Sequence, residues 1–461
     1  MANPYIANTE ADRQAMLEAI GARSLDDLFA DIPDAQRDPP LHLPPPLSEP
    51  ELLAELSTLA GRNRTAGQMT STGGGLACFL GGGAYHHFIP SVVGQLLSRG
   101  EFLTSYTPYQ PEVSQGTLQT AFEFQSLVCE LLGMEVANAG MYDGASALAE
   151  ACLMAAAVTG RRRIAVLDSV HPHYDAVVRT YASGRGLAVD RVTPTGPALL
   201  EEHACLAVQQ PNFLGYLEDG DALAQAAHAV GALHVVAVGE PVSLGLLRPP
   251  GEYGADIAVG EGQSLGIPLS FGGPYLGLFA CRQQYVRQMP GRVVGRTRDA
   301  EGRTGYVLTL QTREQHIRRE RATSNICTSE QLVALAAAVY LCAMGKQGLR
   351  RVAELCYHKA HYAAERIAGL AGYWLPLEGP FFNEFVVGCP RPVADLNQAL
   401  LEEGILGGLD VSPGSDAGLK PGLRGLGEPP EHAMLLCVTE MNTREEIDRL
   451  VEALGRLGGS Q

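Results

Sequence analysis

The sequence predicts an α/β protein built around a large, mostly parallel sheet and followed by a smaller α+β domain. Apolar and β-branched runs alternate with helix-like segments, and they occupy residues 163–169, 186–193, 205–211, 233–240, 255–261 and 275–281. Strands that are apolar throughout are typical of parallel sheets, which helices cover on both faces. Beyond residue 329 the pattern changes to a helix-like run at 330–344, strands at 381–389 and 434–440, and a last helix at 442–458.

The start of the chain is expected to be a helical and extended segment of its own. Short helices are predicted at 11–21 and 24–33. Six prolines fall between residues 38 and 50, so this part is expected to be an extended connector, and a further helix begins at Ser48. The expected domains are residues 1–65, 66–328 and 329–461.

Composition excludes several classes of protein. The 461 residues include 34 basic and 51 acidic side chains, a net charge of −17, which argues against binding to nucleic acid. The apolar stretch around Ala151–Val158 is well short of the ~20 residues of a membrane span. The polar N-terminus shows no export signal, so a cytoplasmic protein without membrane contact is expected.

The numbers and spacing of cysteines and lysines limit the kinds of site that the chain can form. Ten cysteines occur singly, without a CxxC pair, so neither a disulfide framework nor a metal site is expected. The sequence contains only three lysines: Lys346, Lys359 and Lys420.

Three short motifs are candidate parts of a site, and each also has a purely structural interpretation. The glycine triplets Gly73–Gly75 and Gly81–Gly83 follow no predicted strand and are interpreted as flexible turns. The turn Asp143–Ser146 opens a helix whose first N–H groups either bind an anion or are capped within the chain. His171 follows the run 163–169 at the carboxyl end of a predicted strand, where ligands bind in such sheets, although a structural histidine is the commoner case.

Two longer segments are richer in functional groups. Residues 103–125 either present their polar and aromatic side chains to a site or form a packed connector, and the dense part comprises Tyr106, Tyr109, Gln110, Glu112 and Gln115. Residues 291–325 contain eight arginines against four acidic residues, whereas the rest of the chain carries −21. This local charge indicates contact with an acidic ligand or partner, and the alternative is a solvated surface with local ion pairs.

The chain resembles the glycine decarboxylase component, or P-protein, of the glycine cleavage system over essentially its whole length. The resemblance is carried by YIANTEADRQAML at 5–17, FLGGGAYHHFIPSVV at 79–93, residues 103–151, and TLQTREQHIRRERATSNICTSEQL at 309–332. It implies the aspartate-aminotransferase-like fold (fold type I) of pyridoxal phosphate (PLP) enzymes. It also implies the N-terminal-half, or α-subunit, type of the family. Such a subunit takes part in decarboxylating glycine and in passing the aminomethyl group to the lipoyl arm of H-protein.

The chain departs from the family pattern at the residues that hold the cofactor. The family's catalytic lysine lies in its β half, and its place here falls at Gln263 or Ser264, while Val238 stands where an aspartate would pair with the ring nitrogen. PLP acts as an electron sink only when it is imine-linked and polarised at that nitrogen. The resemblance therefore implies that a partner β subunit holds PLP in an α2β2 assembly and that none is bound covalently to this chain. Asp143–Ser146 and His171 are then expected to form a degenerate pocket.

The resemblance also assigns roles to the other candidates. The catalytic residues contributed to a shared αβ active site are Tyr106, Tyr109, Gln110, Glu112 and Gln115. The residues expected to reach the phosphate of the partner's PLP are Thr323, Ser324 and Asn325, and those expected to dock H-protein are Arg296, Arg298 and Arg303. Two alternatives remain: a non-catalytic scaffold or regulatory subunit with a vestigial PLP fold, and a self-sufficient PLP enzyme, against which the missing lysine argues.

Overall fold

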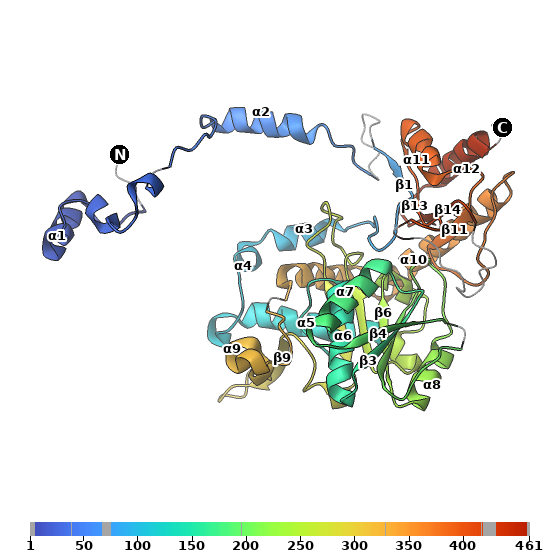
Figure 1. The fold of residues 1–461 in the computed structure, drawn as a ribbon, viewed down its shortest axis with the longest axis horizontal. Coiled ribbons are helices and arrows are strands. Elements are labelled where there is room, and N and C mark those ends of the chain that lie inside the picture. The colour runs from blue at the N-terminus through green and yellow to red at the C-terminus, as the bar shows by residue number, and fades with distance from the viewer. Residues whose placement is uncertain are drawn as a thin grey trace. The chain divides into compact units, whose positions relative to one another are not determined.

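The protein is described by a computed structural model that covers residues 5–37, 39–66, 75–194, 196–327, 329–415, 417 and 430–458. Gly73, Gly74 and Lys420 lie outside these ranges. The chain divides into two units, Met1–Asn63 and Arg64–Gln461 (Figure 1). The three expected domains stay a prediction.

The first unit contains little buried surface. Its α-helices are α1 (Glu10–Ile20) and α2 (Glu49–Ala60), joined by short 3-10 turns at Asp26–Phe29 and Asp34–Gln36. The predicted α-helix at 24–33 is wrong, because this segment forms only a 3-10 turn that buries no residue, and a short helix without packing is not stable. The predicted start of α2 is confirmed, since the N–H and hydroxyl of Ser48 donate to Glu51 at 2.8 and 2.6 Å.

A seven-stranded sheet forms the centre of the second unit, with strand order β2-β8-β7-β6-β5-β3-β4. The strands are β2 (Val136–Ala137), β3 (Arg163–Leu167), β4 (Ala188–Val192), β5 (His203–Gln209), β6 (Leu233–Val238), β7 (Ile257–Glu261) and β8 (Gly277–Cys281). Neighbours from β4 to β7 pair in parallel, whereas β8 is antiparallel to both of its neighbours. Each predicted run overlaps one of these strands, which confirms the α/β architecture. The edge strand β2 was not predicted, because two residues show no periodicity.

Helices cover both faces of the sheet (Figure 1). One apolar core joins the sheet to α6 (Gly144–Thr159), α7 (Pro172–Gly184) and α8 (Gly220–Ala229). The core on the opposite face contains α3 (Ser91–Leu97), α5 (Gln115–Leu132) and α10 (Gln331–Ala368). The short helix α4 (Gly100–Leu103) leads into the loop before α5.

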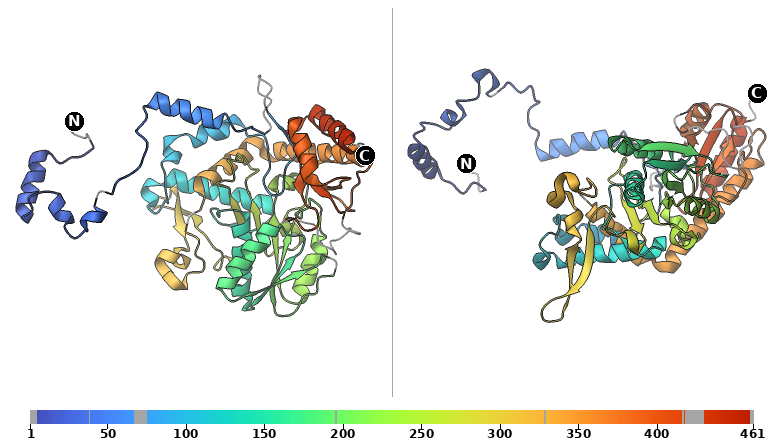
Figure 2. Two further views of the ribbon diagram at one scale, coloured as in Figure 1. Left: turned by 45° about the horizontal axis from the view of Figure 1, so that its top comes forward. Right: turned by 60° about the horizontal axis from the view of Figure 1, so that its bottom comes forward.

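The basic segment 291–325 forms a hairpin that the sequence did not predict. Strands β9 (Val293–Arg298) and β10 (Thr304–Thr309) pair antiparallel, and the hairpin projects from the second unit (Figure 2). Only the first residues of β9 are buried, so the alternation of apolar and polar residues that identifies a strand is missing. The short helix α9 (Gln315–Arg318) follows.

The last part of the chain packs a small sheet against helices. The sheet has the order β11-β14-β13, formed by β11 (Glu384–Gly388), β13 (Leu409–Asp410) and β14 (Ala433–Cys437), with α11 (Val393–Glu402) and α12 (Arg444–Gly458) beside it. A separate parallel pair, β1 (Ala77–Cys78) and β12 (Ile405–Leu406), joins the start of the second unit to this region. The predicted capping box of the last helix is confirmed, because Thr443 N–H donates to Glu446 at 2.9 Å and Glu446 N–H donates back at 3.1 Å.

A glycine interrupts α10 where the sequence predicted the end of a helix. Gly345 has φ 60° and ψ 179°, so two helices meet there at a kink. Within the described residues α10 is long and apolar enough to cross a bilayer by composition, but it includes fully buried core residues such as Tyr340 and Cys356. We therefore interpret α10 as a core helix.

Replacing Gly345 with Ala is expected to destabilise the protein, because this backbone conformation is essentially restricted to glycine and costs other residues about 1–3 kcal/mol. A Cβ at Gly345 or at Gly94 in α3 would meet no atom within 4 Å, but only Gly345 has positive φ. Thermal denaturation should therefore show a lower Tm for Gly345→Ala and an unchanged or higher Tm for Gly94→Ala. Equal Tm values for the two variants would contradict the conformational argument.

Candidate functional site

A cavity of about 550 Å³ opens at the carboxyl ends of the parallel strands. Its walls include the turn Gly81–Gly83, Asp143 at the start of α6, His171 at the start of α7, and Glu261 at the end of β7. Ligands of open α/β sheets bind at this edge. The structure thus brings the predicted Asp143–Ser146 turn and His171 together in one pocket.

Side chains of this protein already occupy the start of α6. The Asp143 carboxylate accepts a hydrogen bond from Ser146 N–H at 2.7 Å, and Glu261 accepts one from Gly144 N–H at 2.9 Å. Glu261 also accepts the N–H groups of Gln263 at 3.0 Å and Leu276 at 3.2 Å. Capping within the chain is therefore the interpretation that the structure supports, because the N–H groups of Gly144 and Ser146 are paired.

The packing and charge around this helix start disfavour a phosphate. A Cβ on Gly144 would lie 2.5 Å from the Tyr174 hydroxyl, so the turn has no spare room. Burial raises the pKa of Glu261 to about 8, and the nearby Asp143 charge adds to the shift. Asp143, Glu261 and Glu330 all line the cavity, and none of its described lining residues is Lys or Arg.

His171 is a structural histidine. Its Nδ1 accepts the His173 N–H at 3.0 Å, so Nε2 carries the proton and donates it to the Gly82 carbonyl at 2.9 Å. Burial lowers the pKa of His171 to about 4, which keeps the ring neutral. A Cβ on Gly83 would lie 3.2 Å from the ring, so the glycine turn packs against the imidazole.

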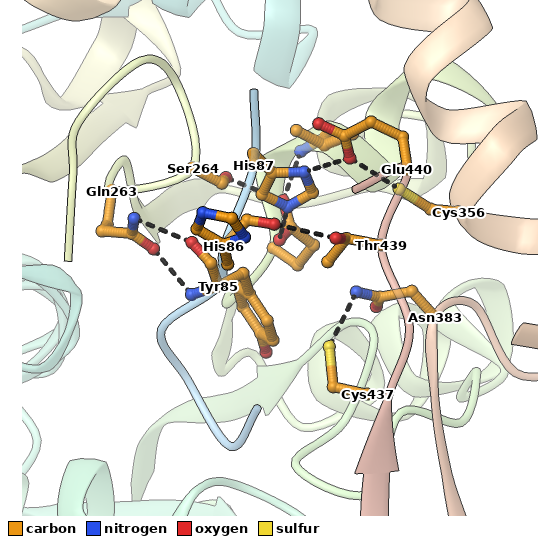
Figure 3. Close-up of polar contacts among 12 residues, drawn as sticks. Tyr85, His86, His87, Gln263, Ser264, Cys356, Asn383, Cys437, Thr439 and Glu440 are labelled. Carbon is orange, nitrogen blue, oxygen red and sulfur yellow. Dashed lines mark hydrogen bonds and ion pairs between the residues drawn. The ribbon is translucent and has the colours of Figure 1, made fainter. Parts of the chain in front are cut away.

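The residues at the expected lysine position are buried and hydrogen-bonded (Figure 3). The Gln263 amide accepts the Tyr85 N–H at 2.8 Å and donates to the carbonyls of Tyr85 at 3.0 Å and Ile267 at 2.8 Å. The Ser264 hydroxyl donates to Glu240 at 2.7 Å. Gln263 therefore joins the segment Gly81–His87 to the edge of the sheet.

β6 ends at Val238, as expected, and a buried carboxyl group follows it in the chain. Val238 is the buried last residue of β6, but Glu240 follows two positions later and places its carboxyl group beside Ser264. Glu240 also lies 3.0 Å from His87 Nε2 and accepts the Val242 N–H at 2.8 Å. Glu240 was not among the candidates from the sequence, because only the last residue of the strand was compared with the family pattern.

A second buried carboxyl group fixes the glycine turn. Glu384 accepts the Gly82 N–H at 2.6 Å and the Tyr85 hydroxyl at 2.8 Å. Burial raises the pKa of Glu384 to about 7, although both hydrogen bonds oppose the shift. The segment Gly81–His87 is thus held by Gln263 on one side and Glu384 on the other.

Four of the five predicted catalytic residues lie on the loop before α5, and the fifth, Gln115, is the first residue of α5 and contacts the β9–β10 hairpin. Tyr109 contacts Arg292, whose guanidinium lies 5.7 Å from the ring centroid and donates to the hydroxyl at 3.5 Å, and His316 meets the ring edge-on at 5.6 Å. Gln115 pairs with the backbone N–H and carbonyl of Tyr306, both at 2.9 Å, so its amide is used structurally. Tyr106 is 81% exposed, and Gln110 and Glu112 are exposed as well. The sequence analysis did not single out Arg292 or His316, because only the fold brings them to the loop.

The three side chains of the segment Thr323–Asn325 differ in their burial. Ser324 is buried and its hydroxyl accepts the Ile326 N–H at 3.0 Å. Thr323 is half-buried, with its N–H bonded to the Arg313 carbonyl at 3.1 Å, while Asn325 is exposed. The Ser324 hydroxyl therefore supports the segment from within the chain.

The three arginines predicted to dock H-protein differ in the groups that they contact. Arg303 forms ion pairs with Asp299 at 2.8 Å and with Glu301, as the local-pairing alternative expects. Arg296 and Arg298 are exposed and two residues apart on β9, which places them on the same face of the hairpin. Arg298 donates to the Gly302 carbonyl at 2.8 Å, and Arg296 lies 6.0 Å from the Phe122 ring centroid.

Solved structures define the class of protein. The chain has the fold of the fold type I PLP-dependent enzymes, which confirms the expected fold. Sphingosine-1-phosphate lyase of Burkholderia pseudomallei has a TM-score of 0.62 at 18% identity, covering 92% of this chain and 94% of that one. Serine palmitoyltransferase of Sphingomonas wittichii has a TM-score of 0.61 at 14% identity, covering 89% and 96%.

Closer relatives define the family. The family model described as glycine cleavage system P-protein matches residues 3–454. A crystal structure of glycine decarboxylase (P-protein) of the glycine cleavage system, in inhibitor-bound form, has a TM-score of 0.88 at 45% identity, covering 99% of this chain and 100% of that one. The probable glycine dehydrogenase (decarboxylating) subunit 1 of Thermomicrobium roseum is 55% identical over 463 residues, 98% of each chain. That of Chlorobium limicola is 51% identical over 464 residues, 98% of this chain and 100% of that one. This chain belongs to the glycine cleavage system P-protein family.

The residues of this chain do not fit the cofactor that the fold implies. No amine stands at Gln263 or Ser264, Glu261 occupies the helix start that would otherwise hold a phosphate, and the cavity is acidic. The Glu240 carboxyl group is engaged with His87 and Ser264.

Because the pKa of Glu384 is raised in the folded protein, the free energy of unfolding should fall as pH rises through this range. The unfolded carboxyl group ionises near pH 4.5, whereas the folded one ionises near pH 7, so unfolding releases a proton between these values. Stability from this group is complete below pH 4.5 and decreases up to pH 7, by roughly 1.4 kcal/mol per pKa unit. Glu384→Gln removes the titration, so the fall in Tm between pH 5 and pH 8 should be smaller than in the parent. The exposed Glu402→Gln control should retain the full decrease, and an unchanged pH dependence in Glu384→Gln would contradict the assignment.

Proposed function

We propose that this chain is the α subunit of a two-subunit glycine dehydrogenase (aminomethyl-transferring), working with a β subunit that holds PLP. The observation that carries the proposal is the occupied cradle: Glu261 caps α6, and Gln263 bonds to Tyr85 where an amine would be needed. The family and its fold are retained while the cofactor-holding groups are replaced. The chain thus acts by completing the partner's active site and binding glycine and H-protein there.

Some apolar side chains of the first unit are not covered within that unit, and we propose that a permanent partner covers them. α2 buries no residue, and its leucines are about half exposed: Leu52, Leu53, Leu56 and Leu59. Apolar helix faces of this kind are covered by another chain in stable assemblies. The partner is the β subunit, and the assembly is α2β2.

The exposed loop supplies groups to the shared site. The accessible residues of this loop are Tyr106, Tyr109, Gln110 and Glu112. The guanidinium of Arg292 contacts the Tyr109 ring. Thr323 and Asn325 are the accessible groups for the phosphate of the partner's cofactor, with Ser324 supporting them. Gln115 positions the loop by fixing it to the hairpin.

The cofactor should be found on the partner alone. When the α and β chains are expressed together with PLP and reduced with borohydride, peptide mass spectrometry is expected to find the pyridoxyl group only on β, because Gln263 and Ser264 stand at the lysine position and no lysine is among the described residues that line the cavity. Glycine decarboxylation should require both chains. A specific adduct on Lys346, Lys359 or Lys420 would overturn the proposal.

The same complex separates an active subunit from a scaffold. Tyr109→Phe keeps the ring contacts with Arg292 and His316 but removes the hydroxyl, so kcat should fall while the α–β association is unchanged. An unaltered kcat in Tyr109→Phe would favour the non-catalytic scaffold. Val113→Ala, an exposed change on the same loop, serves as the control for folding.

Arg296 and Arg298, for which the structure shows no ion pair among the described residues, should recruit H-protein. Arg303, which pairs with Asp299 and Glu301, should not. Replacing Arg296 and Arg298 with Gln is expected to raise the KM for an acidic H-protein roughly three- to tenfold at low ionic strength, and less as salt screens the charges. Arg303→Gln is the matched control, since Asp299 and Glu301 already neutralise Arg303. Steady-state kinetics at two salt concentrations test this, and an equal KM for parent and double variant would contradict the docking role.

A further inference from the structure

Three buried side chains that could bind a metal ion lie close together in the second unit (Figure 3). His87 comes from the segment after the glycine turn, Cys356 from α10, and Glu440 from the loop after β14. Their ligand atoms all lie within 4.8 Å of one another. The side chains of His87 and Glu440 are only 2% and 8% exposed, and Cys356 is 0% exposed.

The spacing is close to that of a tetrahedral zinc site. Cys356 Sγ lies 3.4 Å from Glu440 Oε2, and ordinary zinc–sulfur and zinc–oxygen bonds place two such ligands about 3.5 Å apart. His87 Nδ1 lies 2.7 Å from the same oxygen and would need to open to about 3.3 Å. A rotation of the Glu440 carboxyl group that moves Oε2 by a few tenths of an ångström gives this spacing without a shift of the backbone.

The surroundings of His87 match those of a metal-bound histidine. Nε2 points at the Glu240 carboxyl group at 3.0 Å, and Glu240 is held in turn by the Ser264 hydroxyl and the Val242 N–H. A carboxylate that accepts the far ring N–H fixes the tautomer, so that Nδ1 is free to bind a metal. Here Nδ1 faces Glu440.

The loop that carries Glu440 is also fixed in advance. Lys359, on the same helix as Cys356, donates to the carbonyls of Glu440 and Asn442 at 2.6 Å each. The other Glu440 oxygen accepts the Phe88 N–H at 2.7 Å. Glu440 Oε2 therefore remains directed at His87 and Cys356.

We propose that His87, Cys356 and Glu440 bind a structural Zn²⁺ ion. Thiolate, imidazole and carboxylate together favour zinc over the hard cations that prefer oxygen alone. Binding releases one proton from the imidazole and one from the thiol, so the charge of the cluster is unchanged. The ion joins the segment after the glycine turn to α10 and to the loop after β14.

Cobalt(II) substitution tests the site in the full-length chain. After treatment with a chelator, the chain is titrated with CoCl2 and with ZnCl2, and zinc is counted by native mass spectrometry. One ion per chain is expected, with the thiolate-to-cobalt charge-transfer band and the visible bands of tetrahedral cobalt, and zinc should displace cobalt. Absence of one tightly bound zinc in the parent chain would overturn the proposal and leave a metal-free ion pair.

Variants assign the ligands. Cys356→Ser should abolish the charge-transfer band, whereas Cys437→Ser should keep it, because Cys437 is equally buried but is bonded to Asn383 outside the cluster. Glu240→Gln retains all three ligands and should weaken binding by about 10–100-fold. If Cys356→Ser does not fold, X-ray absorption of the zinc-loaded parent decides, because a single sulfur neighbour supports the site and a shell of nitrogen and oxygen alone overturns it. A band that persists in folded Cys356→Ser would also overturn it.

Discussion

The start of a helix stabilises negative or hydrogen-accepting groups, and in this protein Glu261 takes that place at α6. The rest of the pocket follows from this choice. Because Glu261 also binds the N–H groups of Gln263 and Leu276, it fixes the turn after β7 that directs Gln263 toward Tyr85. The segment Gly81–His87 then lies over the edge of the sheet, and the glycine turn packs on His171. These groups therefore act as a packing interface between the glycine turn and the edge of the sheet.

The architecture was predictable because the strands of the central sheet contain apolar runs such as Ile164–Leu167 in β3 and Val235–Val238 in β6. The β9–β10 hairpin was not, since its arginines and glycines hide the period of a strand and its position is fixed by distant contacts such as that of Gln115 with Tyr306. The loss of the lysine was visible at Gln263 or Ser264. What replaces it was not, because Glu240, His87 and Glu384 lie far apart in the sequence and meet only in the folded chain.

Charge is distributed in two very different ways in this molecule. Within the protein, carboxyl groups are buried and satisfied by N–H and hydroxyl donors, as at Glu261 and Glu384, or by a histidine, as at Glu240 and Glu440. On the hairpin, Arg296 and Arg298 remain exposed in a strongly acidic chain. The first arrangement determines stability and its dependence on pH, while the second acts at a distance on whatever approaches the exposed loop.

The half-exposed leucines of α2 have a consequence for how the protein is made. Within the first unit these side chains, and those of the preceding extended segment such as Leu41 and Leu43, are not covered, so a newly synthesised chain exposes them until the second unit or a partner covers them. Such surfaces are bound by chaperones, attract other unfolded chains and are recognised for degradation. Cells are therefore expected to match the supply of the two subunits, and translation of both from one message would shorten the time that either spends alone.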